Sequence, residues 1–369
     1  MTKKQLKIIF IVQGEGRGHI TQAISMKEII EQNGHQVVSV LVGTSEKREI
    51  PDFFVKEMNV EIKKIASPNF VTDIKYKSIR IIPSIVYNLT KIPTFLNDLK
   101  IIKKEIKKHN PDLIINFYEP LMGLYNMFYR NRIPVISIAH QFIYQHEDFI
   151  FPKSKWFDKF SVKLVTYVAG YKSTKKLAIS FYNLKPSSNK KIIVVPPLLR
   201  KGVFNTNTGN ENFILIYLLN PGYAEEIINW HKENPNVKIN CFWDKKEIQE
   251  EYIYDDNLVF YKINDKKFIE KLSSCKGFMT TAGFESVCEA VYHNKPVFMV
   301  PVQNHFEQYC NSRDAMNINA GLYDTQFDIS KFLEYINNNS FQNKKFKDWT
   351  DSSQIIFEKI LFSYSQNTQ

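Results

Sequence analysis

The chain has 369 residues, of which 44% are hydrophobic and 24% are charged, and its formal net charge is +11. This composition is typical of a globular protein and disfavours a disordered chain or a membrane-spanning one. Since domains commonly hold about 100–200 residues, the length predicts two of them. No apolar run approaches the roughly 20 residues that a bilayer span needs, so we expect a cytoplasmic protein.

Short apolar runs alternate with helical patterns in the first 200 residues. Several of the runs lack polar alternation, as is typical of strands that crossover helices bury on both faces. We therefore predict an α/β fold and a first domain, residues 1–200, with a doubly wound parallel sheet. The expected strands are residues 6–12, 36–42, 60–65, 111–117, 133–139 and 191–196.

Three glycines at alternate positions, Gly14, Gly16 and Gly18, follow the first expected strand and precede a helix that should stop near Gly34. This order indicates a phosphate cradle at a helix N-terminus. A dinucleotide-binding loop would instead read G-x-G-x-x-G, with an acidic residue about twenty positions later. Because the chain has Gly43 and Thr44 there, a nicotinamide-dependent dehydrogenase is disfavoured.

His19 comes directly after the glycines, in the first turn of the expected helix. The positive end of a helix opposes protonation of an imidazole, so His19 could remain neutral and take a proton from a substrate. Alternatively, it only forms a hydrogen bond that holds the loop.

Residues 201–212 are polar, rich in Asn and Thr, and lack periodicity, which predicts a linker. The α/β pattern then restarts, so residues 213–369 should form a second Rossmann-like domain, whose last helix could pack back on the first. Two such domains would face each other across a cleft at the carboxyl ends of their strands. The strands expected here are residues 213–219, 237–243, 257–263, 276–280 and 296–301.

A second polar stretch lies at residues 280–321, where a small-residue turn at Ala282 and Gly283 leads into a helix. Such a turn leaves room for a phosphate at the helix N-terminus. Glu289 follows within that helix, and Glu307 and Gln308 lie at the next strand-to-helix junction. Carboxylates and amides are good partners for the vicinal hydroxyls of a sugar.

The two stretches together resemble the signatures of the GT-B glycosyltransferases, in particular the UDP-glycosyltransferase and MurG-like (glycosyltransferase family 28-like) group. The resemblance implies the GT-B fold and a UDP-sugar donor bound by the second domain. It also implies that the acceptor hydroxyl is bound by the first domain. Matched position by position, it implies Gly283 and Ser286 at the diphosphate, Glu289 at the ribose, and Glu307 with Gln308 at the donor sugar.

The resemblance further implies an inverting displacement in which His19 is the general base. Glu119, which follows the strand at 111–117, would orient His19, unless it is an ordinary solvated carboxylate. No acidic cluster suggests a required metal, and no cofactor beyond the nucleotide-sugar is expected. A UDP-sugar epimerase of the same architecture and a noncatalytic sugar-binding protein remain alternatives.

Two positions depart from the family pattern. Thr281 stands where many relatives place a basic or imidazole side chain against the diphosphate. Glu285 stands where plant enzymes have an amide, and because its carboxylate would repel a diphosphate, we expect it to turn away or to contact the acceptor.

The charge is concentrated in the first half, with 32 Lys and Arg against 16 Asp and Glu through Arg200, and 17 against 22 after it. Residues 74–110 and 153–191 combine many basic residues with aromatic and aliphatic ones, a pattern that suits an anionic membrane surface. Solvated faces of ordinary helices would give the same pattern. No nucleic-acid-binding motif is present. The resemblance to MurG-like enzymes, which act on lipid-linked acceptors at the cytoplasmic face, then implies a lipid or lipid-linked acceptor and peripheral association with the inner face of the cell membrane.

The four cysteines show no CxxC spacing and lie in apolar or helical contexts. We interpret them as small buried hydrophobic residues in a reducing compartment.

Overall fold

The computed structural model describes residues 4–46, 48–68, 71–73, 78–154, 156–218, 221–243 and 250–366. Contacts within the chain form two compact units. Unit 1 holds Met1–Val71, Ile81–Arg200 and Trp349–Gln369, and unit 2 holds Thr72–Arg80 and Lys201–Asp348.

Unit 1 is built on a seven-stranded sheet with the order β3-β2-β1-β6-β7-β8-β9, in which every neighbouring pair is parallel. Its strands are β1 (Lys7–Gln13), β2 (Gln36–Thr44), β3 (Ile62–Ala66), β6 (Leu113–Phe117), β7 (Val135–Ala139), β8 (Lys175–Ile179) and β9 (Ile192–Val195). Its helices are α1 (Arg17–Gln32), α2 (Asp52–Met58), α3 (Ile81–Thr90), α4 (Ile92–His109), α5 (Pro120–Phe128), α6 (Trp156–Ala169) and α14 (Ser353–Gln366), with a 3₁₀ helix at His140–Gln145.

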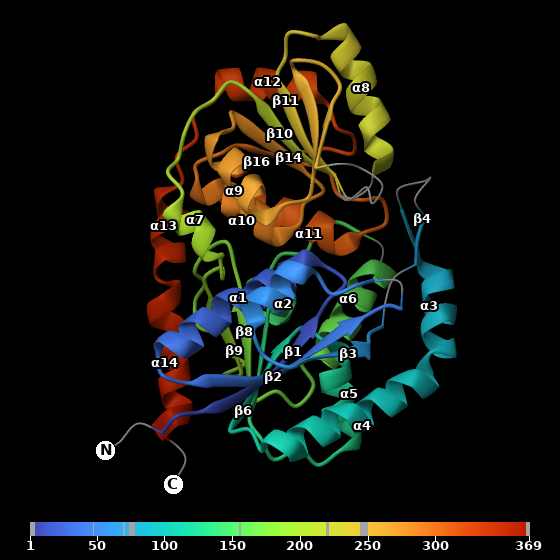
Figure 1. The fold of residues 1–369 in the computed structure, drawn as a ribbon, viewed down its shortest axis with the longest axis vertical. Helices are drawn as coiled ribbons and strands as arrows, with labels where there is room; N and C mark the ends of the chain where they lie inside the picture. The colour runs from blue at the N-terminus through green and yellow to red at the C-terminus, as the bar shows by residue number, and fades with distance from the viewer. Residues whose placement is uncertain are drawn as a thin grey trace. The chain divides into compact units, whose positions relative to one another are not determined.

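The central strands of unit 1 are apolar because helices cover both faces of the sheet. Every residue of β6 and β7 is buried, and Ile9, Ile11 and Ile114 belong to one hydrophobic core with side chains of α4 and α5. Helix α1 contacts α2 and α14, whereas α5 contacts α4 and α6. The last helix of the chain, drawn in red, thus lies beside the first, drawn in blue (Figure 1).

Unit 2 repeats the design with the strand order β12-β13-β11-β10-β14-β15-β16, and only the edge strand β12 is antiparallel to its neighbour. Its strands are β10 (Ile214–Leu218), β11 (Ile239–Trp243), β12 (Glu251–Ile253), β13 (Leu258–Lys262), β14 (Gly277–Thr280), β15 (Val297–Met299) and β16 (Gly321–Tyr323). Its helices are α7 (Lys201–Asn205), α8 (Ala224–Glu233), α9 (Asp265–Ser274), α10 (Phe284–Tyr292), α11 (Phe306–Met316) and α12 (Ile329–Asn338), with a 3₁₀ turn at Pro221–Tyr223.

Two further elements complete the chain. Helix α13 (Lys344–Asp351) carries it from unit 2 back to unit 1, and the short strands β4 (Val71–Asp73) and β5 (Ser78–Arg80) pair with each other.

The predicted fold class, two doubly wound sheets of mostly parallel strands, is confirmed. Each of the eleven expected strands is present, and the stop near Gly34 is confirmed by its φ of +76° just after α1. The sequence pattern missed β4, β5, β8, β12 and β16. Strand β8 begins with two lysines, and the other four have three residues each, too few to show a period.

Residues 201–212, which we expected to link the two domains, begin at the boundary between the two units. They open with the helix α7, whose Val203 is buried, and the Thr208 hydroxyl is 3.0 Å from Nδ1 of His293. The segment is polar because it lies on the surface of unit 2, not because it is unstructured.

Candidate active site

In unit 1, most of the predicted site residues gather at the point where the strand order reverses. Strand β1 has β2 on one side and β6 on the other, so the connections that follow β1 and β6 lead in opposite directions. In doubly wound sheets, ligands bind in the crevice at the carboxyl ends of these two strands. The glycine loop and His19 follow β1, and Tyr118 and Glu119 follow β6.

The glycine loop needs a glycine at position 14 but not at position 16. The Gly14 N–H donates to the Gly43 carbonyl at 2.7 Å, and a Cβ on Gly14 would lie 2.6 Å from the Thr44 side chain. Gly16 precedes α1 with a φ of −107°, and a Cβ there would meet no atom within 4 Å. Gly18 lies in the first turn of α1, where its carbonyl accepts a hydrogen bond from Thr21 at 2.8 Å.

His19 is held by one hydrogen bond and one stacked ring. Its Nδ1 lies 3.3 Å from Oε1 of Gln22, one turn along α1, and its ring stacks on Tyr118 with the centroids 5.5 Å apart. An amide oxygen can only accept, so Nδ1 carries the proton and Nε2 keeps its lone pair. No residue in the described part of the chain bonds to Nε2. The hydrogen bond of His19 thus lies within α1.

Burial lowers the pKa of His19 to about 4, although the hydrogen bond to Gln22 opposes the shift. The imidazole is thus neutral at physiological pH. A neutral imidazole with a free Nε2 lone pair can accept a proton from a hydroxyl group.

Glu119 follows Tyr118 in the chain, and its side chain caps helix α5. It is completely buried and caps α5, with Oε1 accepting from the Leu121 N–H at 3.1 Å and Oε2 accepting from the Ser67 hydroxyl at 2.8 Å. Burial raises the pKa of Glu119 to about 8, the two hydrogen bonds oppose this, and the charge of Glu15 adds to it.

The expected hydrogen bond between Glu119 and His19 is absent among the described residues, which corrects our prediction of a direct orienting contact. The physical reason is the cap: the Glu119 carboxyl group folds back over α5 and packs on Gly43, where a Cβ would overlap it. The neighbour of His19 is instead Tyr118. Its backbone has a φ of +57°, and its hydroxyl lies 2.8 Å from that of Thr166 on α6. Nothing in the sequence pattern marked Tyr118 as a site residue.

A pocket of about 160 Å³ adjoins Glu119 in unit 1. Ser67 both lines it and donates to Glu119. Its wall combines hydroxyl groups with apolar and charged side chains, and it is lined by Thr44, Ser45, Glu46, Lys64, Ile65, Ala66, Ser67, Tyr87, Lys91, Thr94, Phe95 and Asp98.

Unit 2 has its own reversal of strand order between β10 and β14, and the predicted diphosphate turn follows β14. Thr281 is completely buried, and no described residue bonds to its hydroxyl. Ala282 adopts a φ of +60°, a conformation that side chains disfavour. Gly283 is the N-cap residue of α10, and the Ser286 hydroxyl donates to its carbonyl at 3.2 Å.

The acids of α10 are buried inside unit 2. Glu285 is 8% exposed and Glu289 is 1% exposed. Burial raises the pKa of the Cys288 thiol, and the charges of Glu285, Glu289 and Asp314 raise it further. These three acids therefore lie close to Cys288. Glu285, expected to turn away from a diphosphate, is thus enclosed by protein.

Glu307 and Gln308 occupy the first turn of α11, after the neighbouring strand β15. The side-chain oxygen of Gln308 accepts from the Val302 N–H at 2.8 Å. Asn311 of the same helix donates to the Ala282 carbonyl at 3.2 Å, so the structure joins the two predicted donor segments. His305, which the sequence analysis missed, caps α11, and burial lowers its pKa to about 4.

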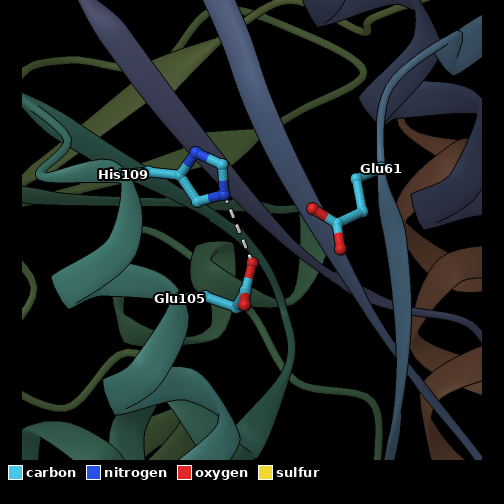
Figure 2. Close-up of side chains that lie close together, drawn as sticks. All are labelled: Glu61, Glu105 and His109. Carbon is cyan, nitrogen blue, oxygen red and sulfur yellow. Dashed lines mark ion pairs between the residues drawn. The ribbon is translucent and has the colours of Figure 1, made fainter.

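Another cluster of possible metal ligands lies away from these segments, with Glu61 just before β3 and with Glu105 and His109 on α4 (Figure 2). His109 Nε2 lies 3.4 Å from Glu105, but Lys63 bonds to both carboxylates and Lys108 bonds to Glu61 at 2.6 Å. The positive charge that a cation would supply is thus already present, and we interpret the cluster as an ion-pair network.

Comparison with known proteins shows which family the chain belongs to. Residues 6–338 match the family described as Glycosyl transferase family 1. The chain belongs to this family. No curated protein sequence matches it. Membership of this family identifies glycosyl transfer as the class of reaction and disfavours the dehydrogenase alternative. The narrower MurG-like assignment stays a prediction.

Solved structures share the GT-B fold of this family 1 transferase at low sequence identity. The glycosyltransferase of kitacinnamycin has a TM-score of 0.66 and 12% identity, covering 98% of this chain and 99% of its own. The calicheamicin glycosyltransferase CalG4 has a TM-score of 0.64 and 12% identity, with 99% of each chain covered. Medicago truncatula UGT71G1, solved with UDP-glucose, has a TM-score of 0.61 and 13% identity, with 98% of each chain covered.

The four cysteines of the transferase are buried and free, as expected. Among the helices of the described residues, none is both long enough and apolar enough to cross a membrane.

Proposed function

We propose that this protein transfers a sugar from a UDP-sugar to the hydroxyl group of an acceptor, with inversion at the anomeric carbon. The observation that carries the proposal is the state of His19: a neutral imidazole at the reversal point of unit 1, with its proton on Nδ1 and its Nε2 lone pair unused. The choice of UDP is supported by structural neighbours solved with UDP-glucose and with UDP-L-rhamnose.

In the proposed reaction, Nε2 of His19 takes the proton of the acceptor hydroxyl as its oxygen attacks the anomeric carbon. The bond from that carbon to the diphosphate oxygen breaks, and UDP leaves. A well-placed base contributes roughly 10²–10⁴-fold to such a step. The acceptor would occupy the pocket beside Ser67, which has the hydroxyl and apolar groups that an alcohol of mixed polarity needs.

The donor would bind in unit 2. Backbone N–H groups at the start of α10, together with Ser286, would hold the diphosphate, because a helix N-terminus carries positive partial charge. This arrangement needs no metal ion. Glu289 would bind the ribose, and Glu307 with Gln308 would bind the sugar. For Glu289, buried at 1% exposure, ribose binding requires the second turn of α10 to open toward the ligand.

The test is a screen of nucleotide-sugars by thermal shift, followed by product analysis with and without alcohols. The proposal expects UDP and at least one UDP-sugar to stabilise the protein, and sugar transfer that stops in His19→Ala. Conversion of a UDP-sugar to its epimer without an acceptor would replace the proposal with the epimerase alternative. Binding of a UDP-sugar with neither transfer nor epimerisation across the screen would favour a sugar-binding protein.

We further propose that the acceptor is lipid-linked and that the protein works as a peripheral protein on an anionic membrane. Support comes from the basic and aromatic stretches of unit 1. In the described parts of these stretches, Lys103, Lys104, Lys107 and Lys108 lie on α4. Residues 74–77 and Lys155, which belong to the same stretches, lie outside the described residues.

A further inference from the structure

Helix α6 presents an apolar stripe to solvent. Trp156 is 75% exposed, and Phe160, Leu164 and Tyr167 are each about half exposed. At 100° per residue these four positions fall on one side of the helix. Four large apolar side chains in one exposed row are more than the scattered single residues that ordinary surfaces carry.

The opposite side of α6 is the one that packs on the protein. Thr166 and Ala169 are buried, and Gly123 of α5 meets the Val168 backbone so closely that a Cβ would overlap it. The exposed row is therefore a different face of α6 from the one that packs in the core of unit 1. The helix is anchored in unit 1 by one side and unpartnered on the other within the described residues.

The surroundings of the stripe are basic and aromatic. Lys159 and Lys163 lie on α6 along one edge of the row, and the Lys163 ammonium lies 5.1 Å from the ring centroid of Phe151. Phe151 belongs to the preceding loop, whose Ile150 is 89% exposed. Asp158, the acid of α6, falls on the side away from Trp156 by the same helical geometry.

We infer that this face of α6, with Ile150 beside it, docks on an anionic lipid bilayer. Apolar and aromatic side chains flanked by lysines are what an interfacial helix needs, because the rings enter the headgroup region and the ammonium groups meet the lipid phosphates. An apolar protein partner would not account for the lysine edge.

Docking through α6 would also serve the proposed transfer reaction, and this part of the inference rests on the proposed function. Thr166, on the packed side of α6, bonds to Tyr118, which stacks on His19. The docking helix thus lies directly behind the residue that contacts the proposed base. If the acceptor is lipid-linked, docking through α6 brings its hydroxyl group to the His19 end of the sheet.

The experiment measures sedimentation with vesicles, without donor or acceptor, so that failure of the transfer reaction does not affect it. Vesicles of phosphatidylcholine alone are compared with vesicles that contain phosphatidylglycerol, at low and high salt. The protein should sediment with the anionic vesicles at low salt only, and the fluorescence of Trp156 should shift to shorter wavelength. Phe160→Ser with Leu164→Ser should weaken binding at least tenfold.

A matched control removes two equally exposed apolar side chains elsewhere, Ile355→Ser with Phe362→Ser on α14, and should bind like the parent. Lys159→Glu with Lys163→Glu should weaken binding to anionic vesicles and leave the thermal shift by UDP unchanged. The inference fails if the α6 variant binds as well as the parent, if the α14 control loses as much, or if neutral and anionic vesicles bind alike. A parent that forms a dimer through α6 and ignores vesicles would also overturn it.

Discussion

The ring of Tyr118 stacks on the imidazole of His19 with 5.5 Å between their centroids and 25° between their planes. The two residues follow the two strands that flank the reversal of strand order in unit 1, and they are almost one hundred positions apart in the chain. The stacked ring limits contact between the imidazole and water, and the lowered pKa of His19 follows from this kind of burial.

Replacing His19 tests the proposed base. His19→Ala should lower the transfer rate by about 10²–10⁴-fold, since the acceptor hydroxyl then has no group to take its proton. The affinity for UDP, measured by calorimetry, should stay within about twofold because the proposed donor-binding residues belong to unit 2. Gln22→Leu serves as the control: it removes the bond at Nδ1 but keeps the ring, so its effect should be smaller.

The pH dependence follows from the pKa of His19, which burial lowers from 6.5 to about 4. The folded protein binds this proton only below about pH 4, so kcat/KM should not fall as the pH is lowered through 6.5. Tyr118→Ala exposes the imidazole and should move the acid limb of the profile upward, toward 6.5. An acid limb at 6.5 in the unaltered protein would contradict the assignment of His19 as the base.

The raised pKa of Glu119 should make its contribution to folding stability decrease as the pH rises. Its pKa is raised from 4.5 to about 8, so between these values the folded protein holds a proton that the unfolded chain has lost. Stability from this group is greatest below pH 4.5 and declines as the pH rises through 8. Glu119→Gln, a neutral isostere, should be favoured over the parent increasingly from pH 5 to pH 8 in urea unfolding.

Glu119→Ala should lose about 1 kcal/mol through the helix cap alone. The transfer rate of Glu119→Gln should stay near that of the parent at pH 7, because the acid is already neutral there. A collapse of the rate in the Gln variant would show that its charge is needed.

Two glycines near the site should respond differently to the same change. A Cβ on Gly43 would overlap the buried carboxyl group of Glu119, so Gly43→Ala should displace the cap of α5 and lower the melting temperature by several degrees. Gly16→Ala should leave the melting temperature almost unchanged, since its Cβ meets nothing within 4 Å. Equal tolerance of both changes would mean that Glu119 is not packed on Gly43.

The ion-pair network near β3 and α4 contains one buried carboxylate, Glu105, and one exposed ion pair, Lys108 with Glu61, so the two can be compared. Glu105 is completely buried and accepts hydrogen bonds from Lys63 and from the Ser39 hydroxyl, so Glu105→Ala should cost about 1–3 kcal/mol in the free energy of unfolding, because the buried hydroxyl loses its partner. Lys108→Ala should cost less than about 1 kcal/mol, because Lys108 and Glu61 are both exposed. A large rise in melting temperature with zinc would instead identify the cluster as a metal site.

The sequence sufficed for the fold because uninterrupted apolar runs such as β6 and β7 have few alternatives to a strand covered on both faces. It also predicted that the glycine loop, Glu119 and the turn at Gly283 each follow a strand, since the apolar runs before them are clear. It could not predict the direction of individual side chains. Glu119 caps its own helix and Tyr118 contacts His19 because the backbone at Tyr118 has a φ of +57°, a conformation that no residue pattern around it signals.

Helix α14 packs beside α1, the helix that carries His19, and comes from the far end of the chain. The order of synthesis therefore matters for this protein. The ribosome releases every strand of both sheets before it releases residues 353–366, so a nascent chain has the His19 helix in place long before the helix that covers its flank. Unit 1, which holds the first strand of the chain, therefore receives α14 only after the strands of unit 2 have been synthesised, and the face of α1 that contacts α14 is not covered by it in the interval.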